Sequence, residues 1–295
     1  LQLIDKKNAA VHLATQLKAA SLGTLAIFIV IMICFDEKLM LLVQDFFGVE
    51  NPFPGFNLGY VPLYVGAGIF TLAVAVFCKA YYPFYEGPEI QTKTLFMRSR
   101  YWLYYALTFM GGARRQIFMV FAAFLMVEKF GYDVTAITLL YMINLIANIF
   151  IAPTLGRLIR RFGERNTLIF EYIGLICVFT GYAFVDDHII AAALYVIDHL
   201  FFAFAISIKT YFQKIAAPKD IASTAGVSFT INHIAAVGLP AVFGFIWLGN
   251  PSMVFFIGAG MAVISLLLAL LIPRDPHEGN ETTLSASRPL AQPAE

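Results

Sequence analysis

Long apolar runs separated by short polar segments dominate the pattern of hydrophobic and polar positions along the chain. A bilayer core is about 30 Å thick and takes roughly 20 apolar residues as an α-helix. Eight runs approach or exceed this length, at residues 19–35, 58–83, 101–128, 134–155, 167–185, 188–212, 223–247 and 253–272. The pattern therefore predicts an all-α fold, a polytopic membrane helix bundle of about eight transmembrane helices.

The polar segments divide this pattern into four parts. We predict two transmembrane helices with an outer loop in residues 1–85, and a six-helix bundle in residues 101–272. Residues 86–100 contain Glu86, Glu89 and Lys93 and are predicted to form a solvated cytoplasmic linker. Residues 273–295 are rich in Pro, Ser and Thr without apolar periodicity, which predicts a disordered cytoplasmic tail.

Composition excludes several classes of protein. Of the 295 residues, 60% are hydrophobic and 13% are charged, a balance that excludes a soluble globular domain. The net charge of +1 gives no basic surface for nucleic acid, so we expect membrane lipid as a partner and no nucleic acid. The three cysteines show no metal-ligand spacing, and no nucleotide-binding or hydrolase motif occurs. We therefore expect no metal, no cofactor and no enzyme.

The positions of the charges predict the orientation of the helices. Sixteen of the 20 Lys and Arg residues lie in the two terminal segments and in one alternate set of loops. The other set of loops holds Lys38 and Lys129 together with seven acidic residues. Because Lys and Arg accumulate on the cytoplasmic side, both termini are predicted to be cytoplasmic.

The loop between the fourth and fifth runs, residues 156–165, has the sequence GRLIRRFGER. It resembles the signature loop of the major facilitator superfamily, G-x-L-x-D-R-x-G-R-R. Arg160 stands where the family usually has Asp, and Glu164 where it often has Arg, so the loop is similar to the weaker copy in the second six-helix half. The position of the loop, after the second helix that follows the long linker, fits that half.

The resemblance implies a secondary transporter that moves a small solute by alternating access, as a multi-pass protein of a bacterial inner membrane. A complete member has twelve helices, so the resemblance implies four more helices before Leu1; a protein of eight spans is the alternative. We expect an anion as substrate, moved with a proton or another coupling ion. A carrier of neutral or cationic solutes, or a non-transporting membrane subunit or assembly factor with the same scaffold, remains the alternative.

Arg114 and Arg115 lie in the middle of the run 101–128, where each would cost roughly 2.5 to 3.5 kcal/mol at the bilayer centre. They are therefore expected to face a cavity or a charged partner. In the family the matching helix lines the substrate path, and guanidinium groups suit carboxylate or phosphate oxygens. We predict that one binds substrate and the other contacts a neighbouring helix; pairing of both with membrane acids is the alternative.

Further polar residues lie inside three of the apolar runs. Asp198 and His199 are candidates for proton coupling, because a buried carboxyl and an imidazole exchange protons near neutral pH; static pairing is the alternative. Other candidates contact substrate or join helices through hydrogen bonds. These are Tyr141, Asn144 and Asn148, which share one helical stripe, and Asn232 and His233 of the seventh run.

A cytoplasmic gate is predicted at the basic loop. Glu171 lies shortly after this loop, and we expect it to pair with one of the loop arginines as a latch. The predicted gate residues are Gly156, Arg157, Arg161, Gly163, Arg165 and Glu171.

Overall fold

The computed structural model describes residues 9–35, 60–81 and 94–284, and these residues are almost entirely helical, with no β-strand among them. The chain divides into two compact units. The larger unit comprises Leu1–Leu22 and Glu89–Glu295, and the smaller unit comprises Gly23–Pro88. Helix α1 (Ala9–Phe35) begins in the larger unit, and helix α3 (Tyr60–Tyr81) belongs to the smaller one.

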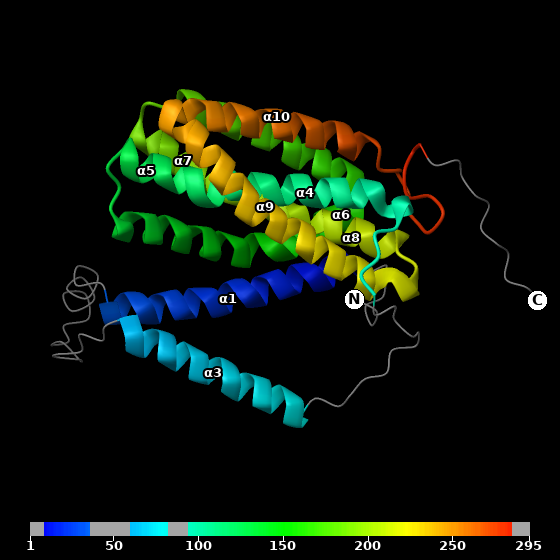
Figure 1. Cartoon of the computed structure of the whole chain (residues 1–295), viewed down its shortest axis with the longest axis horizontal. Helices are drawn as coiled ribbons and strands as arrows, with labels where there is room; N and C mark the ends of the chain where they lie inside the picture. Colours follow the sequence, from blue (N-terminus) through cyan, green and yellow to red (C-terminus); the bar gives the residue numbers. More distant parts are fainter. Residues whose placement is uncertain (1–8, 36–59, 82–93, 285–295) are drawn as a thin grey trace, which may run out of the picture. The chain divides into compact units, whose positions relative to one another are not determined.

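The larger unit contains residues 101–272, for which the sequence predicts a six-helix bundle (Figure 1). Its principal pairs are α6 with α10, α4 with α9, and α6 with α7. Its helices are α4 (Trp102–Gln116), α5 (Ala123–Glu128), α6 (Val134–Phe184), α7 (His188–Phe202), α8 (Ile206–Ile215), α9 (Ile221–Gly249) and α10 (Pro251–Leu270). Short helical turns join them, namely η1 (Ser99–Tyr101), η2 (Ile117–Ala122), η3 (Ala203–Ala205) and η4 (Pro218–Asp220).

Six helical segments among the described residues are long and apolar enough to cross a membrane. One of them, Thr135–Phe184, covers two of the predicted runs, and at 50 residues it is long enough to cross twice. The all-α membrane bundle is therefore confirmed, and the predicted number of about eight helices is approximate.

Helix α6 is interrupted at Gly163, inside the basic loop. The backbone there has φ 79° and ψ 164°, a region that is open only to glycine. The interruption separates residues 134–162 from residues 164–184. The loop predicted from the sequence is therefore a sharp break within one long helical segment, and its second glycine makes the break possible.

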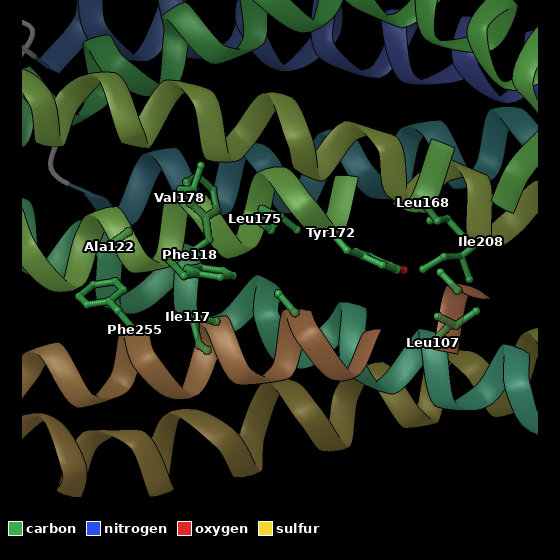
Figure 2. Close-up of a cluster of buried hydrophobic side chains, with 14 of the residues drawn as sticks. Leu107, Ile117, Phe118, Ala122, Leu168, Tyr172, Leu175, Val178, Ile208 and Phe255 are labelled. Atoms are coloured by element: carbon green, nitrogen blue, oxygen red, sulfur yellow. The ribbon is translucent and has the colours of Figure 1, made fainter. Parts of the chain in front are cut away.

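The core of the larger unit lies where α4, η2, α6, α8 and α10 meet (Figure 2). Turn η2 is π-helical, and it follows directly after the two arginines of α4. A π-turn adds one residue to the helical turn, so it changes which residues face inward beyond it. Ile117 and Phe118 of this turn are fully buried, and they pack with Phe179 and Phe255.

The first part of α1 packs closely against α6 within the larger unit. Leu13 and Ala14 of α1 share a small apolar cluster with Leu155 and Ile159. A Cβ atom at Gly156 would lie 2.9 Å from the Ala14 Cβ and 3.0 Å from the Ala10 carbonyl oxygen. The first glycine of the basic loop therefore allows two helix backbones to approach each other.

Gly156→Ala is expected to lower the midpoint of thermal unfolding in detergent, because the added methyl group forces α1 and α6 apart. Overpacking of this kind costs about 1–3 kcal/mol. Gly238→Ala is the matched control, since a Cβ atom added there would meet no atom within 4 Å and Ala favours the helix. A Gly156→Ala protein that melts with the parent would contradict this packing.

The segment after α10 differs from the prediction. Residues 273–295 were expected to form a disordered tail, but residues 273–284 fold back onto the end of the bundle. The Thr283 amide donates to the Leu271 carbonyl oxygen over 2.9 Å, and the Tyr211 hydroxyl donates to the Glu281 carbonyl oxygen. The composition is typical of a flexible segment, whereas the order comes from contacts with residues distant in sequence.

Candidate functional site

A buried charged cluster lies inside the larger unit, around Arg114 of α4. This side chain is only 3% exposed, and its Nη2 atom lies 3.7 Å from the Glu171 Oε1 atom of α6. The guanidinium group also lies over the Tyr172 ring, 4.5 Å from its centroid. Arg114 is therefore held inside the protein by an acid and an aromatic ring.

Asp198 of α7 adds a second acid to this cluster. Its side chain is 2% exposed and interacts electrostatically with Arg114. Three atoms of the cluster have no hydrogen-bond partner among the described residues: Arg114 Nη1, Glu171 Oε2 and Asp198 Oδ2. The cluster thus contains two carboxyl groups and one guanidinium group. Each of these three groups has one polar atom that could accept or donate a further hydrogen bond.

The predicted partner of Glu171 was wrong. An arginine of the basic loop was expected, but the ion pair that the structure gives Glu171 is with Arg114. Glu171 lies eight residues beyond Gly163, about 12 Å along an α-helix, and its side chain points into the bundle. Glu171 therefore belongs to the buried cluster and not to the loop.

The polar stripe of α6 faces α7. The Asn148 Nδ2 atom lies 2.9 Å from the His199 Nε2 atom, and the Tyr141 ring centroid lies 5.9 Å from that of His199. Asn144 is fully buried, and neither polar atom of its amide has a hydrogen-bond partner in the part of the chain that the structure describes. Tyr141 and Asn148 thus contact His199, and the buried Asn144 lies between them on the same stripe.

Arg115 has surroundings quite unlike those of Arg114. It is exposed, and its guanidinium carbon lies 5.4 Å from the centroid of the Phe202 ring. Within the described ranges, no acidic side chain forms an ion pair with it. Arg114 and Arg115 therefore have different surroundings, and the expectation that one of them binds substrate stays a prediction.

Asn232 and His233 of α9 are also exposed. Each side chain has a partner one turn earlier in its own helix: Asn232 Nδ2 donates to Ser228 O over 3.1 Å, and His233 Nδ1 lies 2.9 Å from Phe229 O. Asn232 lies against Gly112 of α4, and Arg115 follows Gly112 by three residues on the same helical stripe. Arg115 therefore lies about one helical turn along α4 from the point where Asn232 of α9 contacts that helix.

The basic loop makes a contact that its sequence does not predict. The Lys214 Nζ atom of α8 lies 2.9 Å from the Glu164 Oε2 atom, and the Glu164 side chain is buried. Arg157 Nη2 donates to Thr154 Oγ1, and the Arg161 guanidinium lies over the neighbouring Phe162 ring. The acid of the loop that pairs with another helix is thus Glu164, one of the two residues that depart from the family pattern.

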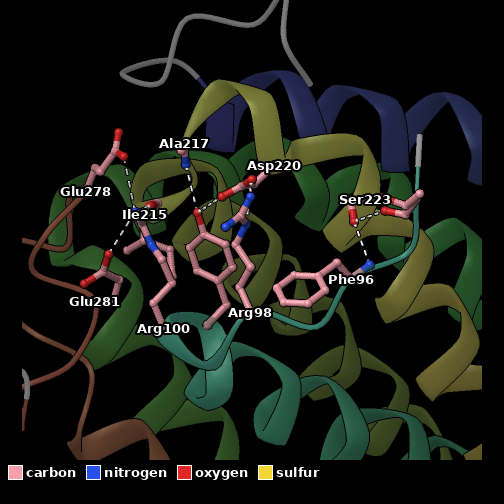
Figure 3. A network of polar contacts seen from close by, with 11 residues as sticks. Phe96, Arg98, Arg100, Ile215, Ala217, Asp220, Ser223, Glu278 and Glu281 are labelled. Atoms are coloured by element: carbon pink, nitrogen blue, oxygen red, sulfur yellow. Dashed lines mark hydrogen bonds and ion pairs between the residues drawn. The ribbon is translucent and has the colours of Figure 1, made fainter. Parts of the chain in front are cut away.

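A second polar network was also missed, at the end of the bundle where η1, η4 and the segment after α10 meet (Figure 3). The Asp220 carboxylate lies 2.7 Å from Arg98 Nε and accepts a hydrogen bond from the Tyr101 hydroxyl. Arg100 pairs with Glu278 and Glu281 of the folded C-terminal segment. Residues 94–100, which were assigned to the linker, are therefore attached to the six-helix bundle.

Asp220→Asn is expected to lower the free energy of unfolding by about 1–2 kcal/mol, because the substitution removes the negative charge that forms the ion pair with Arg98. The 37% exposure of Arg98 keeps the effect below that of a fully buried pair. Asp186→Asn is the control, since Asp186 pairs with Lys129 but is 89% exposed. Equal melting midpoints for both variants in detergent would contradict a structural role for Asp220.

Comparison with known proteins gives one family. The family model described as Major Facilitator Superfamily matches residues 51–240 and, in a second overlapping match, residues 105–292. A search of curated proteins finds no match.

Proposed function

The chain belongs to the Major Facilitator Superfamily, a family of secondary transporters, and from this we propose that it moves a small anion across the membrane by alternating access. The observation that carries the proposal is the exposed Arg115 in the middle of an apolar span. An arginine at this depth is costly in lipid, so we infer that it faces a water-filled path. The planar guanidinium group suits a carboxylate or a phosphate.

We assign the first contact with the anion to Arg115 rather than Arg114, since Arg114 is buried with its own acids. Asn232 and His233 are proposed to complete the site from α9, because both are exposed and α9 packs against α4. Asn144, Asn148 and Tyr141 of α6 are proposed to complete the polar surroundings of the site on the side of His199. The supporting observation is the contact of Asn148 with His199.

Proton coupling is assigned to Asp198 and His199, and the cytoplasmic gate to the basic loop with Gly156, Arg157, Arg161, Gly163 and Arg165. Both termini are assigned to the cytoplasm, and the protein to a bacterial inner membrane. The distribution of Lys and Arg supports this orientation. The burial of Asp198 in the middle of an apolar segment supports a proton site, because ionisable side chains inside a membrane bundle are characteristic of proton pathways.

The test is thermal unfolding of the purified protein in the presence of phosphate, sulfate, short carboxylates, a sugar and an organic cation. A ligand that binds only the native state at 100 times its Kd stabilises it by about 2.7 kcal/mol. We expect an anion to raise the midpoint of the parent and of Arg161→Gln, an exposed loop variant, but not that of Arg115→Gln. Stabilisation by the sugar or cation alone would favour a carrier of neutral or cationic solutes.

A further inference from the structure

One exposed face of α6 changes from apolar to basic along its length. Ile143, Ile146 and Phe150 are exposed, Phe150 to 74%, and we call these three residues the apolar stripe. Arg157 and Arg161 are exposed as well, and they follow Phe150 by seven and eleven residues. Spacings of three, four, seven and four residues keep all five side chains on the same face of the helix. The basic part of this face begins about 10 Å along the helix from Phe150.

The basic part carries positive charge that the protein does not balance locally. We define the basic surface as Arg157, Arg160 and Arg161, which are all exposed. Among the residues that the structure describes, no acidic side chain forms an ion pair with any of the three. The acid of the same loop, Glu164, is buried and pairs with Lys214 of α8 over 2.9 Å. The basic surface is therefore available to an anionic ligand.

The basic surface lies at one end of a membrane span. The segment that contains it, Thr135–Phe184, is long enough to cross a bilayer twice, and it is broken at Gly163. The three arginines come shortly before this break, so they lie where the first crossing ends. The apolar stripe therefore lies at the depth of the acyl chains, and the basic surface at the depth of the headgroup phosphates.

The arginines of this face retain hydrogen-bond donors for a ligand. Arg157 uses its Nη2 atom in a bond to the Thr154 Oγ1 atom over 3.1 Å. The guanidinium carbon of Arg161 lies 5.4 Å from the centroid of the Phe162 ring, a contact that does not use its N–H groups as hydrogen-bond donors. A guanidinium group has further N–H donors, and its planar fork fits the oxygens of a phosphate. A ligand that carries both a phosphate and an apolar chain would match both parts of the face.

We propose that the basic surface binds the phosphate of an anionic phospholipid, whose acyl chain lies along the apolar stripe. The uncompensated charge favours an anionic lipid over a zwitterionic one, because a zwitterionic headgroup brings its own positive group. A soluble anion would contact the arginines alone and leave the apolar stripe unused. This lipid site does not involve Arg115, and it does not depend on the proposed transport of an anion.

Native mass spectrometry of the purified full-length chain tests the proposal. The protein is titrated with phosphatidylglycerol or with phosphatidylcholine of the same acyl chains, and the parent is expected to bind phosphatidylglycerol more tightly. Arg157→Gln/Arg161→Gln should weaken binding of phosphatidylglycerol roughly thirtyfold, which corresponds to about 1 kcal/mol for each arginine, and leave binding of phosphatidylcholine unchanged.

Lys209→Gln/Arg274→Gln is the matched control. It also removes two positive charges from exposed positions, and neither residue forms an ion pair with an acid in the described ranges. Its affinity for phosphatidylglycerol should equal that of the parent. An equal loss in both double variants would reveal a general effect of net charge and would overturn the proposal.

Equal affinity of the parent for the two lipids would also overturn the proposal, and this result needs no variant to fold. A soluble competitor then separates a lipid from a free anion. Phosphatidylglycerol should stay bound in an excess of glycerol phosphate, because the soluble molecule lacks the acyl chains that contact the apolar stripe. Displacement of the lipid by an equal concentration of glycerol phosphate would identify a free anion as the occupant and refute the lipid site.

Discussion

Arg114→Gln is expected to destabilise the protein more than any other single charge change in the bundle. The substitution leaves Glu171 and Asp198 buried without a counter-charge, and removing one partner of a buried ion pair costs about 3–5 kcal/mol. The midpoint of thermal unfolding in detergent measures the loss. The loss should become smaller at acidic pH, since protonated carboxyl groups need no counter-charge.

A second substitution separates this explanation from simple loss of packing. Arg114→Gln/Glu171→Gln removes one acid together with the base, so the double variant should melt above Arg114→Gln alone. Such a coupling is a property of groups in contact. If the losses of stability from the two single substitutions simply add at neutral pH, Arg114 does not stabilise the charge of Glu171. The explanation of the stability loss by a missing counter-charge would then be wrong.

Arg115→Gln has the second large effect, on binding rather than on folding. Arg115 is exposed and has no acidic partner within the described ranges, so its loss should leave the melting midpoint close to that of the parent. A hydrogen bond to a charged group contributes about 1.5–3 kcal/mol, which corresponds to a roughly ten- to hundredfold loss of anion affinity. Titration of the stabilising anion against both proteins measures the ratio.

Arg161→Gln serves as the matched control for this comparison. It removes the same charge from an exposed position in the basic loop, where the guanidinium lies over Phe162. Anion affinity should therefore equal that of the parent. Equal weakening by Arg115→Gln and Arg161→Gln would point to a general effect of net charge and not to a specific contact.

The membrane helices and the basic loop could be predicted because both depend on local sequence. Apolar runs of sufficient length determine the spans, and Gly163 allows the backbone break that separates two of them. The different surroundings of Arg114 and Arg115 also follow from helical geometry, since consecutive residues point about 100° apart. These features need no knowledge of how the helices pack.

The partners of the charged residues could not be predicted, because they depend on packing between distant segments. Glu171 is close in sequence to the loop arginines, yet it pairs with Arg114, 57 positions earlier. The partners of Asp220 and Glu281 could not be predicted for the same reason. Asp220 pairs with Arg98 and Glu281 with Arg100, both more than 100 positions earlier in the sequence. The order of residues 273–284 likewise comes from these contacts and not from apolar periodicity.

Uptake of labelled anion by the purified protein in liposomes tests the central claim most directly. With phosphate, sulfate and short carboxylates as probes, the parent is expected to take up one of them when a proton gradient is imposed. Arg115→Gln should not take it up, whereas Arg161→Gln should match the parent. Uptake that is equal in the parent and Arg115→Gln, or confined to neutral or cationic solutes, would contradict an anion path through Arg115.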